Sequence, residues 1–133
     1  MAVDWGERRI GLAVSDPLGI LATGLPTLHV RSRADAVEKV AEVARDREVA
    51  RIVVGLPLRM SGAEGVQAVK SQAFADDLRK HFKLPVHLWD ERLSSAEANR
   101  LLRETDLSIE KRGQAVDRMA AILILQNWMD SRR

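Results

Sequence analysis

An acidic residue lies inside the first apolar stretch of the chain. Asp4 stands between Val3 and Trp5, and carboxylates are uncommon in strands, above all in central ones. An ionised carboxylate buried without partners is costly, so Asp4 is expected to have a cation, several donors or a raised pKa. The same pattern also fits an Asp that ends a strand and caps the turn at Gly6.

A pair of acids, Asp90 and Glu91, directly follows the apolar run 86–89. In open α/β sheets, sites form beyond the carboxyl ends of the strands, which is where this pair falls. Taken alone, the pair is better explained as an ordinary acidic loop, with Glu91 paired to Arg92 or lying near a helix start.

Asp117 is the most informative of the acidic residues. In a helix it shares a face with Ala121, Ile124 and Trp128, so one carboxylate begins a row that is otherwise apolar. That row predicts that Asp117 points toward a sheet rather than into water. A competing interpretation is that Asp117 supports the helix dipole or an ion pair with a neighbouring arginine, Arg118 or Arg92.

Convergence of these acids would require cations. Two like charges ~4 Å apart repel by about 4 kcal/mol even at an effective dielectric of 20. Hard oxygen ligands in a chain without Cys favour Mg²⁺ or Mn²⁺. Two such ions, roughly 3.5–4 Å apart, can activate water and stabilise the leaving oxygen in phosphodiester hydrolysis. The three histidines have no paired metal spacing, and His87, inside a strand, is expected to be packed or on the surface.

The elements that must position these acids begin with three strand-like stretches. Apolar residues cover 2–5 and 10–14, and a turn at 17–19 leads into a third stretch over 20–30. Short turns between apolar runs predict a three-stranded antiparallel meander, with a bend in its third strand at Gly24 and Pro26.

The spacing of apolar residues then becomes helical. Ser32 can cap a helix with Asp35 three residues on, and apolar residues recur at helical spacing over 37–44. A second helix is expected to carry three apolar side chains one turn apart. They are Phe74, Leu78 and Phe82.

The apolar run 52–56 resembles a strand buried on both faces, and Pro85 opens another short strand over 86–89. A helix capped by Ser94 or Ser95 and ending near Arg103, and a last helix over about 114–129, complete the chain. The order predicts an α/β fold, in which three antiparallel strands and then two parallel strands form a mixed sheet with helices on both faces.

Length and composition narrow the classes of protein. The 133 residues fit one domain over 1–133, and the absence of Cys excludes disulfides and thiol catalysis. The start shows no signal peptide and the apolar stretch 119–125 is too short for a bilayer, so we expect a cytoplasmic protein without membrane contact. A net charge of +2 argues only weakly for nucleic acid, because a solvated surface explains it as well.

Four blocks of the sequence resemble the YqgF/RuvX family in order and spacing. They are AVDWGERRIGLAVSD at 2–16, VVGLPL at 53–58 with the loop from Gly62 to Gly65, WDERLS at 89–94, and DRMAA at 117–121 with ILQ at 124–126. Each block alone is weak, but four in order across nearly the whole chain are specific.

The resemblance implies an RNase H-like fold and a nuclease that uses Mg²⁺ or Mn²⁺. By its motifs, Asp4, Glu91 and Asp117 would be catalytic metal ligands, with Asp90 as a further ligand or close support. The family is associated with maturation of the 5′ end of pre-16S ribosomal RNA and with resolution of Holliday junctions. Basic residues in or beside loops and helix starts would bind the nucleic acid. They are Arg8, Arg9, Arg59, Arg92, Lys111, Arg112 and Arg118.

Three positions depart from the family's pattern. Trp5 replaces a small aliphatic residue and should add bulk to the floor of the site. Arg59 and Ser61 stand where the family often has Asn and Asp, which makes that loop more cationic and suited to phosphate.

Two other functions compete with the nuclease. Asp4-x-Gly6 also resembles the phosphate loop of actin-like ATPases, whose second half this chain lacks the length to supply. A catalytically silent nucleic-acid-binding module is the other, although such modules typically lose their acids. The residues do not choose between pre-ribosomal RNA and a four-way DNA junction, and symmetric cutting of a junction would need a homodimer.

Overall fold

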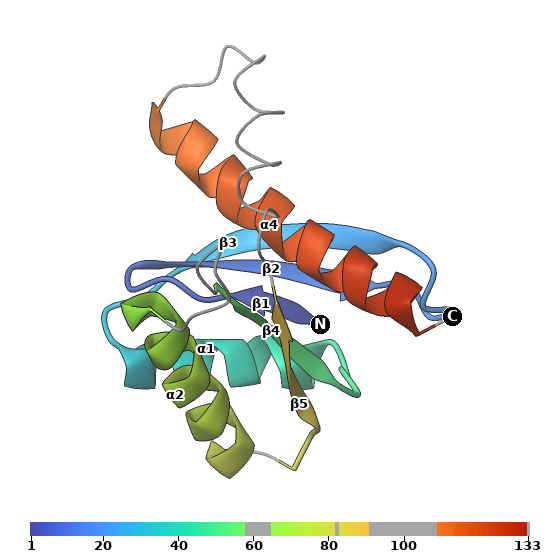
Figure 1. Cartoon of the computed structure of the whole chain (residues 1–133), viewed down its shortest axis with the longest axis horizontal. Helices are drawn as coiled ribbons and strands as arrows, with labels where there is room; N and C mark the ends of the chain where they lie inside the picture. The colour runs from blue at the N-terminus through green and yellow to red at the C-terminus, as the bar shows by residue number, and fades with distance from the viewer. Residues whose placement is uncertain (58–64, 82, 91–108, 133) are drawn as a thin grey trace.

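Five strands form one sheet in the order β3-β2-β1-β4-β5 (Figure 1). The computed structural model describes residues 1–57, 65–81, 83–90 and 109–132, and for 109–114 it describes the backbone only. The strands are β1 (Ala2–Asp4), β2 (Arg9–Ser15), β3 (Ala22–His29), β4 (Ile52–Leu56) and β5 (Val86–Asp90).

The pairing of the strands confirms the predicted mixed sheet. β1 and β2 are antiparallel, as are β2 and β3, whereas β4 runs parallel to both β1 and β5. The carboxyl ends of β1, β4 and β5 therefore lie at one edge of the sheet, and Asp4 and Asp90 are the last residues of two of them.

The third strand begins later than predicted and is bent where predicted. Ile20 and Leu21 belong to a turn, because the Asp16 carboxylate accepts both of their backbone N–H groups. The pairing with β2 is irregular between Ile10 and Leu12, opposite Pro26. Proline suits this position because β3 is an edge strand, where a missing N–H costs little.

Two helices cover one face of the sheet. α1 (Arg33–Asp46) and α2 (Val66–His81) pack there in a core that includes Val40, Phe74 and Val54. Ser32 caps α1 as expected, since its Oγ accepts the N–H of Asp35 at 3.1 Å. The two predicted helices are thus confirmed, although Phe82 lies outside the described residues.

The last helix, α4 (Ile109–Ser131), crosses the other face of the sheet over β1, β2 and β3 (Figure 1). Its row of Ala121, Ile124 and Trp128 packs toward the sheet as predicted. The helix exceeds the predicted 114–129 at both ends. Its first residues include good helix formers, and Gly113 costs only about 1 kcal/mol inside a helix.

The helix expected up to Arg103 and the loop over 59–64 fall outside the described residues. Among the helices of the described part, none combines the length and apolar character that a membrane span requires.

Candidate active site

Asp117 is held against the sheet by small residues beneath α4. A Cβ built on Gly11 of β2 would lie 2.6 Å from the carbonyl carbon of Asp117, and nearer still to its oxygen. Real Cβ atoms essentially never approach other atoms below 3.0 Å, so only glycine fits at position 11 without a shift. Gly11 therefore sets how closely α4, and with it Asp117, approaches the sheet.

A second glycine lies under the next residue of the helix. A Cβ on Gly24 of β3 would meet the aliphatic part of the Arg118 side chain, 2.7 Å from its Cδ. Arg118 therefore lays its stem over β3, while the residue remains exposed. Here the obstacle is a flexible side chain, whereas at Gly11 it is backbone.

The surroundings of Asp117 disfavour the ionised form of its carboxyl group. Burial raises the pKa of the Asp117 carboxyl above its ordinary value, and the charges of Arg9 and His29 partly oppose that rise. Arg9 Nε lies 3.1 Å from Asp117 Oδ2, yet Oδ2 has no hydrogen-bond partner of good geometry among the described residues. The sequence had suggested Arg118 or Arg92 as the ion-pair partner of Asp117. The partner among the described residues is Arg9 and not Arg118, and Arg92 lies outside them.

Asp4 reaches the same end and the same face of the sheet. It is two residues from Ala2, whose side chain packs beneath α4, and its Cα partner on β2 is Gly11. Gly11 thus stands directly beside Asp4 in the sheet and directly beneath Asp117 of the helix. The fold brings together two of the three predicted acids, and the third, Glu91, lies outside the described residues.

A pocket of about 470 Å³ opens beside Asp117. We call it the Asp117 pocket, and its lining residues are Gly6, Glu7, Arg8, Arg9, His29 and Asp117. His29 is the Cα partner of Arg9 across β2 and β3. The place of His29 beside Asp117 was not predicted, because it depends on the register between β2 and β3.

The other histidine considered from sequence is packed, as expected. His87 of β5 stacks against Trp128 of α4, with ring centroids 5.6 Å apart. The third one, His81, ends α2 and is exposed.

Asp90 ends β5 on the opposite face of the sheet from Asp4. Val86 and Leu88 of this strand pack in the core of α1 and α2, whereas Trp89 packs with α4. Alternation along a strand therefore places Asp90 on the α1 and α2 side. This geometry favours a supporting position for Asp90 over direct ligation together with Asp117.

The structure describes only some of the basic residues that were predicted to bind nucleic acid. Arg8 and Arg9 lie in and after the turn between β1 and β2, and both line the Asp117 pocket. Lys111 and Arg112 belong to the first turns of α4, where only the backbone is described. Arg59 and Arg92 lie outside the described residues.

The donors present suit a hard divalent cation. Asp4 and Asp117 offer carboxylate oxygens, which Mg²⁺ and Mn²⁺ prefer. One of these oxygens, Asp117 Oδ2, is covered and lacks a well-formed hydrogen bond, so a cation would relieve its burial. The described residues alone contain no group of three acidic or histidine side chains able to hold a metal, and Glu91 is not among them.

Comparisons with known proteins agree with this architecture. Residues 1–131 match the RuvX family, described as Holliday junction resolvase. A relative from Koribacter versatilis, named as a proposed pre-16S rRNA nuclease, is 54% identical over 132 residues, 99% of this chain and 86% of its own length. Relatives with the same name from Pelotomaculum thermopropionicum and Myxococcus xanthus are 47% and 44% identical over at least 98% of this chain and 86–88% of their own lengths.

Solved structures show the same fold at low sequence identity. The structure of Thermus thermophilus RuvC superposes with a TM-score of 0.58 at 14% identity, covering 98% of this chain and 93% of that protein. T. thermophilus RuvC in complex with a Holliday junction substrate gives the same score and identity, covering 98% and 92%. The predicted RNase H-like fold is confirmed by this likeness.

Proposed function

The chain belongs to the RuvX family of Holliday junction resolvases, and from this premise we propose that it is a divalent-metal-dependent endonuclease acting on structured nucleic acid. The observation that carries the proposal is the position of Asp117, whose carboxylate is buried at a cost on the helix turn that packs over Gly11, the strand partner of Asp4. A protein retains such an arrangement for function more readily than for stability.

Asp4, Asp117 and Glu91 are the proposed ligands of Mg²⁺ or Mn²⁺. When bound, the metal supplies an activated water and charge stabilisation at the leaving oxygen of a phosphodiester. The protein's own contribution is to fix two carboxylates on rigid elements, one on a strand and one on a helix. Arg9 and His29, on the wall of the Asp117 pocket, are placed to contact a phosphate that enters it.

We place the 5′ end of pre-16S ribosomal RNA first among substrates, because relatives 40–54% identical across nearly the whole chain carry that name. This assignment puts the protein in the cytoplasm. Cutting of four-way DNA junctions is the second candidate, supported by the family's description. Symmetric junction cutting needs two active sites, so that activity would require a homodimer.

The test is to incubate the wild-type protein with labelled pre-16S RNA and with a labelled four-way junction, each with Mg²⁺ or Mn²⁺. Cleavage at defined positions of one substrate, abolished by EDTA, is the expected result. Binding of either substrate without cleavage under any metal would favour the silent binding module instead. Saturable binding of ATP would favour the actin-like fragment.

A further inference from the structure

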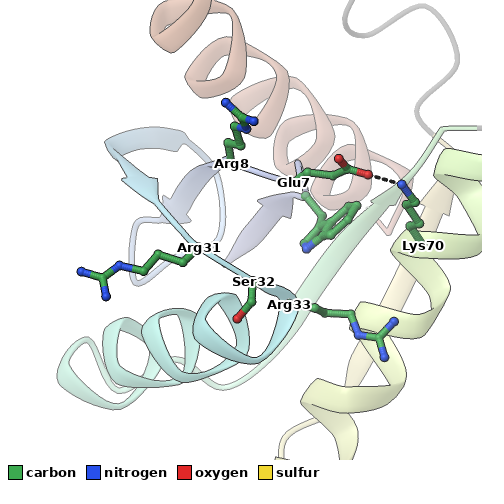
Figure 2. A pocket seen from close by; sticks show the side chains of 7 residues that line it. Glu7, Arg8, Arg31, Ser32, Arg33 and Lys70 are labelled. Carbon is green, nitrogen blue, oxygen red and sulfur yellow. Dashed lines mark hydrogen bonds and ion pairs between the residues drawn. The ribbon is translucent and has the colours of Figure 1, made fainter.

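A second pocket, of about 370 Å³, shares residues of the β1–β2 turn with the Asp117 pocket (Figure 2). We call it the Lys70 pocket, and its lining residues are Trp5, Glu7, Arg8, Arg31, Ser32, Arg33 and Lys70. It is built from the β1–β2 turn, the start of α1 and the side of α2. Glu7 and Arg8 line both pockets, so the two pockets adjoin at the turn.

The Lys70 pocket holds four cationic side chains and one carboxylate. Lys70 is paired with Glu7, and Arg33 with Asp77 of α2 at 2.7 Å. All four of these side chains are between about one third and one half exposed, and ion pairs of that kind contribute only ~0–1 kcal/mol. Incoming phosphates can therefore replace these carboxylates at little cost.

Two further cations, Arg8 and Arg31, form no salt bridge within 4.0 Å with a carboxylate of the described residues, although Arg8 acts on Glu7 and Arg31 on Asp35 through their charges. Both residues are exposed. They leave a net positive charge on the rim of the pocket, which attracts polyanions.

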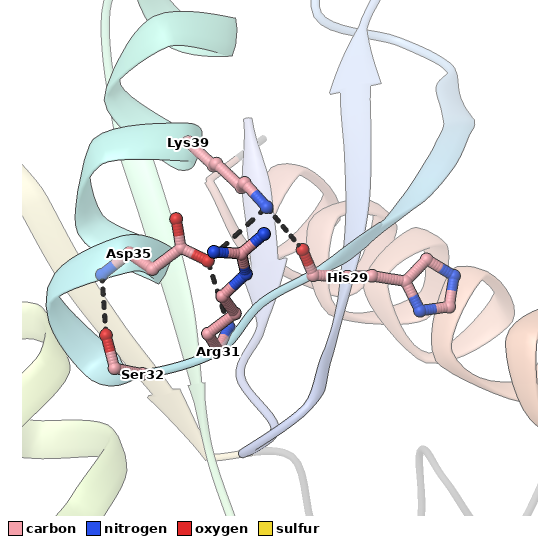
Figure 3. A network of polar contacts seen from close by, with 5 residues as sticks. All are labelled: His29, Arg31, Ser32, Asp35 and Lys39. Atoms are coloured by element: carbon pink, nitrogen blue, oxygen red, sulfur yellow. Dashed lines mark hydrogen bonds and ion pairs between the residues drawn. The ribbon is translucent and has the colours of Figure 1, made fainter.

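Hydrogen bonds tie the loop that carries Arg31 to α1 (Figure 3). The N–H of Arg31 donates to Asp35 Oδ2 at 2.9 Å, and Lys39 Nζ donates to the backbone oxygen of His29 at 2.7 Å. His29 lines the Asp117 pocket and Arg31 lines the Lys70 pocket. The same short stretch of chain, tied to α1 at both residues, therefore contributes to both pockets.

The directions of the arginines decide which kind of anion fits. Figure 2 shows Arg8, Arg31 and Arg33 extending away from one another around the rim. A single phosphate or free nucleotide would need donors that converge on one point, whereas a chain of phosphates can be met one charge at a time.

We infer that the Lys70 pocket binds the sugar–phosphate backbone of the nucleic-acid substrate beyond the bond cut in the Asp117 pocket. Arg8 contacts the strand where it crosses the β1–β2 turn, and Arg31, Arg33 and Lys70 contact the following phosphates. This inference rests on the proposed nuclease function, because it extends the same bound strand. It adds a binding surface on the α1 and α2 side of the sheet to the one beside α4.

The test measures binding of a fluorescent RNA and of a fluorescent four-way junction by anisotropy, over a series of salt concentrations in EDTA. Arg31→Ala should weaken binding roughly three- to tenfold and reduce the slope of log affinity against log salt by about 0.7–0.9. Glu7→Gln should do the reverse, because it frees Lys70: tighter binding and a steeper slope.

Arg45→Ala is the matched control, since it removes the same charge from the last turn of α1, the helix that follows Arg31. Arg45 lies about 20 Å from the start of α1, by the rise of an α-helix over its length. Equal effects of Arg31→Ala and Arg45→Ala would overturn the inference, as would unchanged or weaker binding by Glu7→Gln. Specific displacement by millimolar inorganic phosphate, lost in Arg31→Ala, would overturn it in favour of a single-anion site.

The cleavage assay of the wild type separates this inference from the proposed function. A wild type that cuts while Arg31→Ala binds like Arg45→Ala refutes the pocket and leaves the nuclease in place. A wild type that never cuts, with the salt slopes changed as expected, refutes the nuclease and supports the pocket as a nucleic-acid-binding surface.

Discussion

Replacing Gly11 with Ala should impair the active site more than it impairs the fold. The added Cβ would lie 2.6 Å from the carbonyl carbon of Asp117, and an ordinary contact begins at 3.4 Å. The backbone of α4 must therefore retreat by at least about 0.8 Å, since neither backbone can rotate away. Overpacking of this kind costs about 1–3 kcal/mol, which corresponds to a melting temperature lowered by roughly 4–12 °C.

The expected loss of activity is larger. A misplacement of about 1 Å can lower a catalysed rate about a hundredfold, so Gly11→Ala should cut roughly ten- to a hundredfold more slowly below its melting temperature. The assay is single-turnover cleavage at saturating substrate, with circular dichroism to verify that the variant is folded.

Gly24→Ala supplies the control. Its Cβ meets the flexible stem of Arg118 and the end of Ile122 at 3.0 Å, both of which can move. The melting temperature should fall by only a few degrees, and the single-turnover rate at saturating substrate should stay within about threefold of the wild type. A folded Gly11→Ala protein that cuts at the wild-type rate would refute the conclusion that Gly11 positions Asp117.

Three further predictions follow from the charges of the site. Activity should be lost as the pH falls through the raised pKa of Asp117, because the protonated acid cannot bind metal. Arg9→Ala should move this loss of activity to higher pH, because the charge of Arg9 lowers the pKa of Asp117. A pH–rate profile whose acidic midpoint is the same in Arg9→Ala as in the wild type would contradict this. Chelation should abolish cleavage and Ca²⁺ should support it poorly, whereas full turnover in excess EDTA would end the metal account. Arg59→Ala should lower the slope of log affinity against log salt concentration by about one, with little change in sequence preference. An unchanged slope would count against a phosphate contact from the loop that carries Arg59.

The sequence predicted the sheet and its helices because burial leaves clear patterns of apolar residues. The run 52–56 has no polar side chain, 86–89 is interrupted only by His87, and the row behind Asp117 repeats at helical spacing. The start of β3 was predicted wrongly at Ile20, because the hydrogen bonds that the Asp16 carboxylate accepts from the N–H groups of Ile20 and Leu21 depend on a side chain rather than on hydropathy.

Within the site, the sequence singled out Asp4 and Asp117 as unusual but could not supply their neighbours. The ion pair of Asp117 with Arg9 and the proximity of His29 depend on the register of β2 with β3, which an irregularity shifts between Ile10 and Leu12. Pro26 predicted a bend near that shift, but not which residues of the two strands would then stand opposite one another. The position of Asp90 on the opposite face was, by contrast, available from simple alternation along β5.

The central claim is that Asp117 is retained for metal-dependent cleavage at a cost in stability, and Asp117→Asn tests it most directly. Because the folded-state pKa of Asp117 is raised, its ionised form destabilises the fold above that pKa, and the effect vanishes below its ordinary value of 3.8. We predict that at neutral pH in EDTA the variant melts at the same or a higher temperature, yet cuts substrate at least about a hundredfold more slowly with metal. A variant that melts at a lower temperature and still cuts, with melting and cleavage measured on the same preparation, would contradict the account.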